Sequence, residues 1–232
     1  PGFLKTSNHR ERYHWRWDAP EKYQINMRAY FRMLSGIDHA MSRVLRVLEE
    51  EGLAGNTIVV YSADNGYYMG DRGFAGKWSH HEQSQRVPLV VYDPRQSEGS
   101  RGRIVDTMSL NLDLPSTFLD WADVTIPESY QGDSLKPIIE GEPELAGWRK
   151  EFYCEHFNPR YSMSWNGVRG ERFKYARYTD QNPEYEFLHD LENDPDELVN
   201  LVENPEFEAI LKQLRKRTND LAEAYATAIP PR

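Results

Sequence analysis

The chain has 232 residues, of which 39% are hydrophobic, and a formal net charge of −9 at pH 7. This length allows a substantial core in one or two domains. The acidic balance disfavours non-specific binding to nucleic acid, and no apolar run approaches the ~20 residues that span a membrane. The one cysteine, Cys154, excludes an intrachain disulfide. We therefore expect a soluble acidic protein that binds no nucleic acid.

The first 52 residues contain one strong signal, a long helix. Residues 1–19 are polar, basic and aromatic without a sustained period, which predicts a surface loop. Arginines in this loop could touch an anionic substrate, although a solvated loop is the simpler interpretation. From residue 21 to 51, apolar residues recur at helical spacing until Gly52. We expect this helix, starting near Pro20, to pack its apolar stripe on a sheet.

Two apolar, β-branched runs at 58–61 and 87–92 are typical of buried strands. The segment between them is punctuated by glycines and rich in ionisable residues: Asp64, Asn65, Asp71, Arg72, Lys77, His80, His81 and Glu82. Open α/β sheets bind ligands just past the carboxyl ends of their strands. The sequence therefore places the candidate site in this loop.

Several residues of this loop suit the binding of a cation and an anion. Asp64 and Asn65 offer two hard oxygen donors, and Gly66 allows a sharp turn, although Asp-Asn-Gly is also an ordinary strand-ending turn. Lys77 could place a positive charge on a sulfate or phosphate, or could be a solvated surface lysine. His80 and His81 could act as an acid or base, but neighbouring side chains point apart on any regular element, so at most one is expected to reach the site. We take His80 as the one that would contact the substrate.

The order of these motifs resembles a known family. Asp-Asn-Gly, Gly-Asp-Arg-Gly-Phe, Gly-Lys-Trp, a Glu and Arg-Val-Pro-Leu follow one another here as in the C-terminal half of the sulfatase family, within the alkaline-phosphatase-like superfamily. Asn-Leu-Asp-Leu-Pro at 111–115 and Tyr-Gln-Gly-Asp-Ser-Leu at 130–135 extend the match. The resemblance implies an α/β fold: part of an alkaline-phosphatase-like doubly wound sheet, followed by a small antiparallel α+β subdomain.

The resemblance also implies roles for single residues. Asp64 and Asn65 would bind a divalent metal, usually Ca²⁺ with Mg²⁺ as the alternative, and Lys77 would act in catalysis by binding a sulfate oxygen. Many family members carry His where this chain has Arg72. Arg72 could therefore bind an anionic substrate group or merely pair with Asp71.

The nucleophile motif of the family is absent from this sequence. Sulfatases of this type use a formylglycine made from the first residue of Cys/Ser-x-Pro-x-Arg, and no such motif occurs here; Cys154 lies in Cys-Glu-His-Phe. The early Asp-Asp metal pair is also missing. We expect formylglycine only in an N-terminal part that is not in this chain. The chain alone should be inactive, and should stay bound to that part or self-associate through exposed strand edges.

The second half predicts more elements and a boundary. A strand is expected at 104–114, after a loop at 96–103, and short helices at 115–121 and 135–139. Glycine, proline and charge at 140–149 suggest a boundary between a catalytic part, residues 1–145, and a subdomain, residues 146–232. In the subdomain we expect strands at 151–155, 167–169, 172–178 and 186–191, and a final helix at 205–226.

His156 follows the first strand of the subdomain, which in related enzymes brings polar side chains to the mouth of the active site. His156, Asn158 and Arg160 could therefore help to select the substrate, or could lie on a rim loop without contacts. The leading interpretation is a metal-dependent sulfuric ester hydrolase that acts on a sulfated small molecule or carbohydrate. A phosphoesterase or phosphonate hydrolase of the same superfamily, and a non-catalytic binding or assembly module, are the alternatives.

Overall fold

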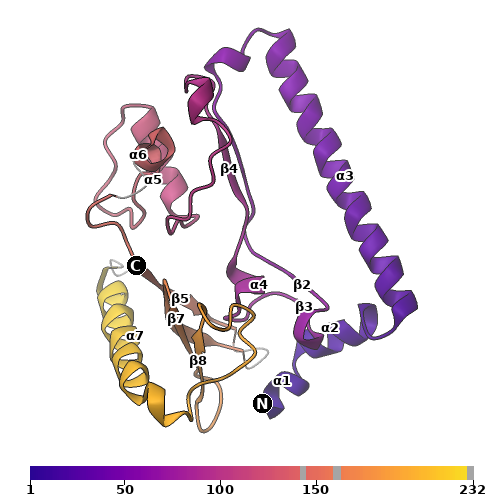
Figure 1. Cartoon of the computed structure of the whole chain (residues 1–232), viewed down its shortest axis with the longest axis vertical. Coiled ribbons are helices and arrows are strands. Elements are labelled where there is room, and N and C mark those ends of the chain that lie inside the picture. Colours follow the sequence, from indigo (N-terminus) through magenta and orange to yellow (C-terminus); the bar gives the residue numbers. More distant parts are fainter. Residues whose placement is uncertain (142–144, 159–162, 229–232) are drawn as a thin grey trace. The chain divides into compact units, whose positions relative to one another are not determined.

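The computed structural model describes residues 1–141, 145–158 and 163–228 (Figure 1). The chain folds as two compact units, which we call unit 1 and unit 2. Unit 1 consists of Pro1–Asp18, Asn65–Arg86 and Arg149–Arg232, and unit 2 consists of Ala19–Asp64 and Val87–Trp148. The predicted division into residues 1–145 and 146–232 stays a prediction, since a compact unit is not by itself a domain of a family.

Unit 2 begins with the long helix that the periodicity predicts. Helix α3 spans Pro20–Glu50, with Pro20 in its first turn, and Gly52 follows its end with a φ of 68°. None of its residues is buried. The expectation that its apolar stripe packs on a sheet is therefore wrong for this chain, because the described residues offer no surface that covers it.

Strand β1 (Val59–Ser62) pairs with β4 (Leu89–Tyr92) in an antiparallel ladder that places Val59 opposite Tyr92. Both strands were expected to be buried, but β1 is half-buried and β4 largely exposed. Two strands have too little sheet around them to bury both of their faces.

Short elements complete unit 2: 3₁₀ helices η1 (Ala54–Asn56) and η3 (Glu98–Ser100), and helices α5 (Asp113–Trp121) and α6 (Lys136–Glu140). Both helices lie within two residues of their predicted positions. The strand predicted at 104–114 is wrong, because that segment is irregular until α5 begins. Asp113 bonds the backbone N–H groups of Leu110 at 2.7 Å and Asp133 at 3.0 Å, so side chains organise this part of the backbone.

Unit 1 begins with two helices where a loop was predicted, α1 (Gly2–Lys5) and α2 (Asn8–Arg16). Ser7 caps α2 by accepting a hydrogen bond from the backbone N–H of Arg10. The helix was missed because it is polar on nearly every side, which removes the apolar period from the sequence.

The remainder of unit 1 is built on a four-stranded antiparallel sheet in the order β5–β6–β7–β8. The strands are β5 (Glu151–His156), β6 (Trp165–Gly170), β7 (Phe173–Tyr178) and β8 (Tyr185–Asp190). A 3₁₀ helix, η5 (Pro205–Phe207), leads into α7 (Glu208–Ala228), which runs along the sheet (Figure 1). All four strands and the final helix confirm the sequence prediction.

Both faces of this sheet are covered. Val168, Tyr175 and Leu188 pack against Leu211 and Leu214 of α7. The opposite face carries a second cluster: Leu4, Met163, Trp165, Ala176, Tyr178 and Phe187. Neighbouring residues of a strand point to opposite faces, so Lys174 and His189, which are paired across β7 and β8, share the face of the second cluster. None of the helices in residues 1–141, 145–158 and 163–228 has the length and hydropathy of a membrane span.

Candidate functional site

The loop at 65–86 is a compact part of unit 1. It contains the short ladder of β2 (Tyr68–Met69) with β3 (Ala75–Gly76), a 3₁₀ turn, η2 (Asp71–Gly73), and helix α4 (Glu82–Gln85). Gly66 lies so close to α4 that a Cβ there would be 2.3 Å from the Gln83 carbonyl oxygen. Glycine is therefore required at this position for close backbone approach, beyond the sharp turn that the sequence suggested.

The loop brings Asn65 and Lys77 together. The Lys77 ammonium donates a hydrogen bond to Oδ1 of Asn65, while Nδ2 of Asn65 donates to the Gly66 carbonyl at 2.9 Å. The amide oxygen of Asn65 therefore faces the charged side chain. Asp64, the last residue of a unit 2 segment, directly precedes Asn65 in the chain. Two of the residues expected to bind metal and sulfate thus lie side by side in unit 1.

Helix α2 supports the Lys77 backbone, a role that the sequence analysis missed. The buried His9 ring hydrogen-bonds through Nε2 to the Lys77 carbonyl. Arg10 donates from Nη1 to the Gly73 carbonyl at 2.9 Å. Burial lowers the pKa of His9, which keeps the imidazole neutral near pH 7. The signal that could have found this helix is Ser7 as an N-cap, with His9 and Arg12 one turn apart.

Trp78, the residue after Lys77, is fixed from several directions. Its φ is 89°, and its backbone N–H donates to the Ser84 hydroxyl at 2.8 Å. The Trp165 indole donates to its carbonyl at 2.8 Å, and the Arg12 guanidinium lies 5.4 Å from its ring centroid. A non-glycine residue with positive φ is uncommon and persists where surrounding contacts hold it. The conformation of the backbone next to Lys77 is therefore imposed by its neighbours.

His156, at the end of β5, stacks on Trp78 with ring centroids 5.9 Å apart and planes 12° from parallel. Its Nε2 is buried and has no hydrogen-bond partner among the described residues. Burial lowers the pKa of His156, so the ring is neutral near pH 7. The backbone N–H of Asn158 donates a hydrogen bond to the Ser164 hydroxyl at 2.9 Å. Arg160 lies outside the described residues.

Arg72 and His80 point into the interior of unit 1. Arg72 has a φ of 56° and donates from Nη1 to the Glu197 carbonyl at 2.7 Å, while Asp71 accepts from the Met69 N–H at 3.0 Å. His80 has no exposed surface. Substrate contacts by Arg72 and His80 stay predictions, and these placements do not favour them.

A buried ion-pair cluster connects the loop to the sheet. Lys174, 1% exposed, bridges Glu82 of α4 at 2.6 Å and Glu197 at 2.7 Å. Although burial by itself raises the pKa of Glu82, the Lys174 ammonium and the Arg169 guanidinium outweigh it and lower that pKa. The residues that follow Lys77 are therefore tied electrostatically to β7.

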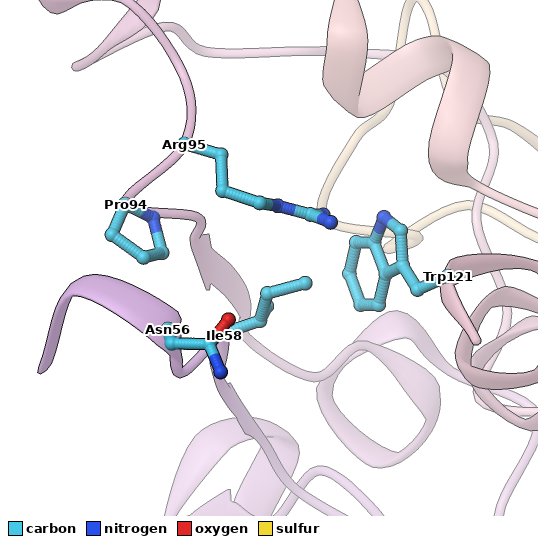
Figure 2. Close-up of a pocket in the computed structure, with 5 residues that line it drawn as sticks. All are labelled: Asn56, Ile58, Pro94, Arg95 and Trp121. Carbon is cyan, nitrogen blue, oxygen red and sulfur yellow. The ribbon is translucent and has the colours of Figure 1, made fainter. Parts of the chain in front are cut away.

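Unit 2 has a pocket of about 270 Å³, lined by Asn56, Ile58, Pro94, Arg95 and Trp121 (Figure 2). Arg95 is already paired with Asp93 at 2.7 Å. The lining contains no carboxylate, histidine or lysine, and none of the predicted site residues. The chemistry of the 65–86 loop, and not this hollow, defines the candidate site.

Comparison with known proteins agrees with this fold. A family model for sulfatases matches residues 5–124, and a model for the C-terminal part of N-sulphoglucosamine sulphohydrolase matches residues 70–224. The chain therefore belongs to the sulfatase family and has the α/β fold of the alkaline-phosphatase-like superfamily. The resemblance read from the sequence motifs is confirmed.

Three individual matches show how similar the chain is to a known sulfatase, to a solved structure with a sulfated sugar and to a phosphonate hydrolase. N-acetylglucosamine-6-O-sulfatase of Bacteroides thetaiotaomicron is 33% identical over 208 residues, which are 88% of this chain and 37% of that protein. A solved structure in complex with its substrate D-glucosamine-2-N,6-O-disulfate matches with a TM-score of 0.81 and 31% identity, over 89% of this chain and 42% of that one. Phosphonate monoester hydrolase of Agrobacterium radiobacter matches with a TM-score of 0.73 and 26% identity, over 86% and 41%. The chain spans less than half the length of these relatives.

Proposed function

We propose that the protein is a sulfuric ester hydrolase in which this chain supplies part of a divalent-cation site and a cationic contact to the sulfate. The proposal is supported by family membership and by one observation above the others: the Lys77 ammonium lies against the side chain of Asn65. The nucleophile, a formylglycine by resemblance, belongs to residues that this chain does not contain.

Asp64 and Asn65 fit a hard divalent cation, Ca²⁺ or Mg²⁺, in their chemistry. Both present oxygen, and Nδ2 of Asn65 donates to the Gly66 carbonyl, so Oδ1, which accepts from the Lys77 ammonium, is the atom that could also face a cation. Two oxygen donors are too few for such a cation, so further ligands must come from other residues. When bound, the cation supplies charge that stabilises the sulfate oxygens.

Lys77 is the residue we assign to sulfate binding. An ammonium on a fixed backbone is a preorganised positive charge, which acts on the transition state without reorganisation. His9 holds the Lys77 carbonyl, and Arg10 and Arg12 of α2 add positive charge to the same loop of an otherwise acidic chain. This local charge suits an anionic ester.

A sulfated hexosamine is the substrate class that the comparisons favour, since the matches include an N-acetylglucosamine-6-O-sulfatase and a solved structure with a bound glucosamine disulfate. His156 offers a buried Nε2 beside Trp78, and this nitrogen has no hydrogen-bond partner in the part of the chain that the structure describes. A nitrogen of a neutral imidazole can donate a hydrogen bond to a sugar hydroxyl or accept one from it, depending on the tautomer. We assign His156 to substrate selection.

The test uses the protein that joins this chain to its nucleophile segment. Hydrolysis of 4-nitrophenyl sulfate should fall about 10²–10³-fold in Lys77→Ala, the loss expected for one preorganised contact. Lys77→Arg, which keeps the charge, should retain part of the rate. Lys212→Ala, which removes an exposed lysine of α7, is the matched control. Unchanged turnover in Lys77→Ala contradicts the assignment.

The phosphonate monoester hydrolase neighbour supports a second candidate function, because sulfate and phosphonate esters share tetrahedral anionic geometry. The same enzyme should be assayed on 4-nitrophenyl phenylphosphonate. A higher kcat/KM on the phosphonate ester than on the sulfate ester favours a phosphonate hydrolase over a sulfuric ester hydrolase. No turnover of either ester by protein that carries the nucleophile favours the non-catalytic binding module.

Unit 2 supports a proposal about the partner. The apolar stripe of α3 is exposed, as is Val90 of β4, and the relatives are more than twice as long as the part matched here. We propose that the rest of the catalytic domain covers this surface, and that the isolated chain self-associates through it. A monodisperse monomer of the isolated chain in sedimentation contradicts the second statement.

A further inference from the structure

Three buried histidines meet in the interior of unit 1. His80 and His81 follow β3, and His189 lies on β8. One ring nitrogen from each lies within 4.8 Å of the others, and the Nε2 atoms of His80 and His189 are 3.2 Å apart. Tetrahedral zinc, with Zn–N bonds of about 2.0–2.1 Å, sets neighbouring nitrogens about 3.3 Å apart. This pair already has that spacing.

The other nitrogen of each ring is held by an oxygen. His189 Nδ1 lies 3.0 Å from the Val199 carbonyl, and His80 Nδ1 lies 3.0 Å from the Tyr178 hydroxyl. A carbonyl only accepts, so His189 carries its proton on Nδ1 and presents the lone pair of Nε2 to the cluster. Histidines that bind metals typically have this arrangement, with the non-coordinating N–H fixed by a neighbouring group.

His81 follows the same pattern. Its Nδ1 lies 2.6 Å from the Tyr68 hydroxyl and 3.3 Å from the Ser79 hydroxyl, which leaves Nε2 as the atom that can coordinate. Burial lowers the pKa of each of the three rings, so all are neutral ligands near pH 7. The Tyr68 and Tyr178 hydroxyls can rotate to accept from Nδ1, as binding through Nε2 requires.

We propose that His80, His81 and His189 form a site for a zinc-class transition-metal dication, bound through their three Nε2 atoms. Imidazole nitrogen selects zinc, cobalt, nickel or copper over Ca²⁺ and Mg²⁺, which prefer oxygen. In the metal-free protein the His80 Nε2–H donates to His189 Nε2. Binding moves that proton to Nδ1 of His80, and the Tyr178 hydroxyl turns to accept it, so no net proton is released.

Two cations, Lys174 and Arg72, lie near the three rings, and their charge opposes that of a bound dication. Lys174 is matched by Glu82 and Glu197, and Arg72 brings its own charge close enough to lower the pKa of His81. Arg72 Nε and Nη2 are buried and have no hydrogen-bond partner among the described residues. A water or small anion in the fourth metal position would accept from them. The bound metal would join the loop that carries Lys77 to β8.

The experiment uses protein without an affinity tag, refolded with one equivalent of Co²⁺ because the buried rings do not admit metal freely. We expect the visible absorption of four-coordinate Co²⁺, its loss when Zn²⁺ displaces the cobalt, and a rise in Tm with Zn²⁺ that is retained in Asp64→Asn. Absence of this absorption from folded protein overturns the proposal.

Variants identify the ligands. His189→Gln should abolish the cobalt absorption, whereas His39→Gln, on the exposed surface of α3, and Asp64→Asn should leave it unchanged. Absorption that survives in folded His189→Gln, or that disappears in Asp64→Asn, overturns the assignment. Tyr178→Phe keeps the aromatic packing and removes the oxygen that holds His80, so it should weaken zinc affinity about 10–100-fold. If His189→Gln does not fold, Tyr178→Phe provides the test. An unchanged zinc affinity in Tyr178→Phe then contradicts the proposed site.

Discussion

The two units of the chain use similar sequence patterns with different results. In unit 1, most apolar residues of β6, β7 and β8 are buried, because α7 covers one face of the sheet and Leu4 and Met163 pack on the other. In unit 2, the 31-residue helix α3 buries no side chain. Its exposed apolar residues are Tyr23, Ile25, Phe31, Met33, Leu34, Ile37, Val44, Leu45 and Val47.

The difference teaches that apolar periodicity predicts an element but not what covers it. Burial of apolar surface contributes roughly 25 cal/mol per Å², and only where a second surface removes it from water. Unit 1 contains that second surface. Most of the candidate site, including Asn65, Lys77 and His156, is built on this covered unit, so its geometry rests on a packed interior.

The largest effect that tests this contrast is expected at Lys174. Lys174→Met leaves the carboxylate of Glu197 buried without its cation, and the free energy of unfolding should fall by about 3–5 kcal/mol. Urea unfolding followed by circular dichroism measures the change. Lys212→Met, at an exposed i,i+4 pair with Glu208, is the control and should change stability little. Equal stability of the two variants would show that the buried cluster does not hold unit 1 together.

A leucine in each unit sharpens the comparison. Leu188 of β8 has no exposed surface, so Leu188→Ala removes packed methyl groups and should cost about 2–5 kcal/mol. Leu45 of α3 is 41% exposed, and Leu45→Ala should cost under about 0.5 kcal/mol in the isolated chain at concentrations low enough to keep it monomeric. Both are measured by chemical denaturation. A large loss in Leu45→Ala would mean that another molecule already covers α3 in solution.

The sequence predicted the elements with strong local signals and the family with its ordered motifs. Helix α3, the four strands of unit 1 and helix α7 follow from periodicity and turn residues. The strand at 104–114 failed because Asp113 binds backbone groups there, a contact that alternation of apolar residues does not reveal. Helix α2 was missed because a polar helix has no apolar period.

The candidate site was likewise predicted only where the sequence carries a local motif. Asp64, Asn65 and Lys77 were named from motif order, and the structure brings Asn65 and Lys77 together. The His9 contact to the Lys77 carbonyl spans 68 positions, and His80 to His189 spans 109. Contacts of this kind depend on the packing of the sheet against the loop, which no local pattern contains. The buried histidine cluster was therefore beyond reach of the sequence, although two of its members adjoin in the chain.

The smallest effect concerns the edge of the unit 1 sheet and depends on pH. The Arg172 guanidinium bonds Asp190 at 3.0 and 2.8 Å and holds the pKa of that carboxyl well below its usual range. The unfolded chain, with an Asp pKa of about 3.9, binds a proton before the folded protein does. The stabilisation is therefore complete above that value and is lost as pH falls toward the folded pKa.

Urea unfolding between pH 3 and pH 6 measures this loss. Asp190→Asn, which cannot ionise, should lose less stability than the parent protein as the pH is lowered. Asp196→Asn, at an exposed position of the following turn, should lose as much as the parent. Because Arg172 is about half exposed, added salt should shrink the difference between Asp190→Asn and the parent. If the free energy of unfolding falls equally with pH in Asp190→Asn and in the parent protein, the Arg172–Asp190 ion pair does not contribute to the stability of unit 1.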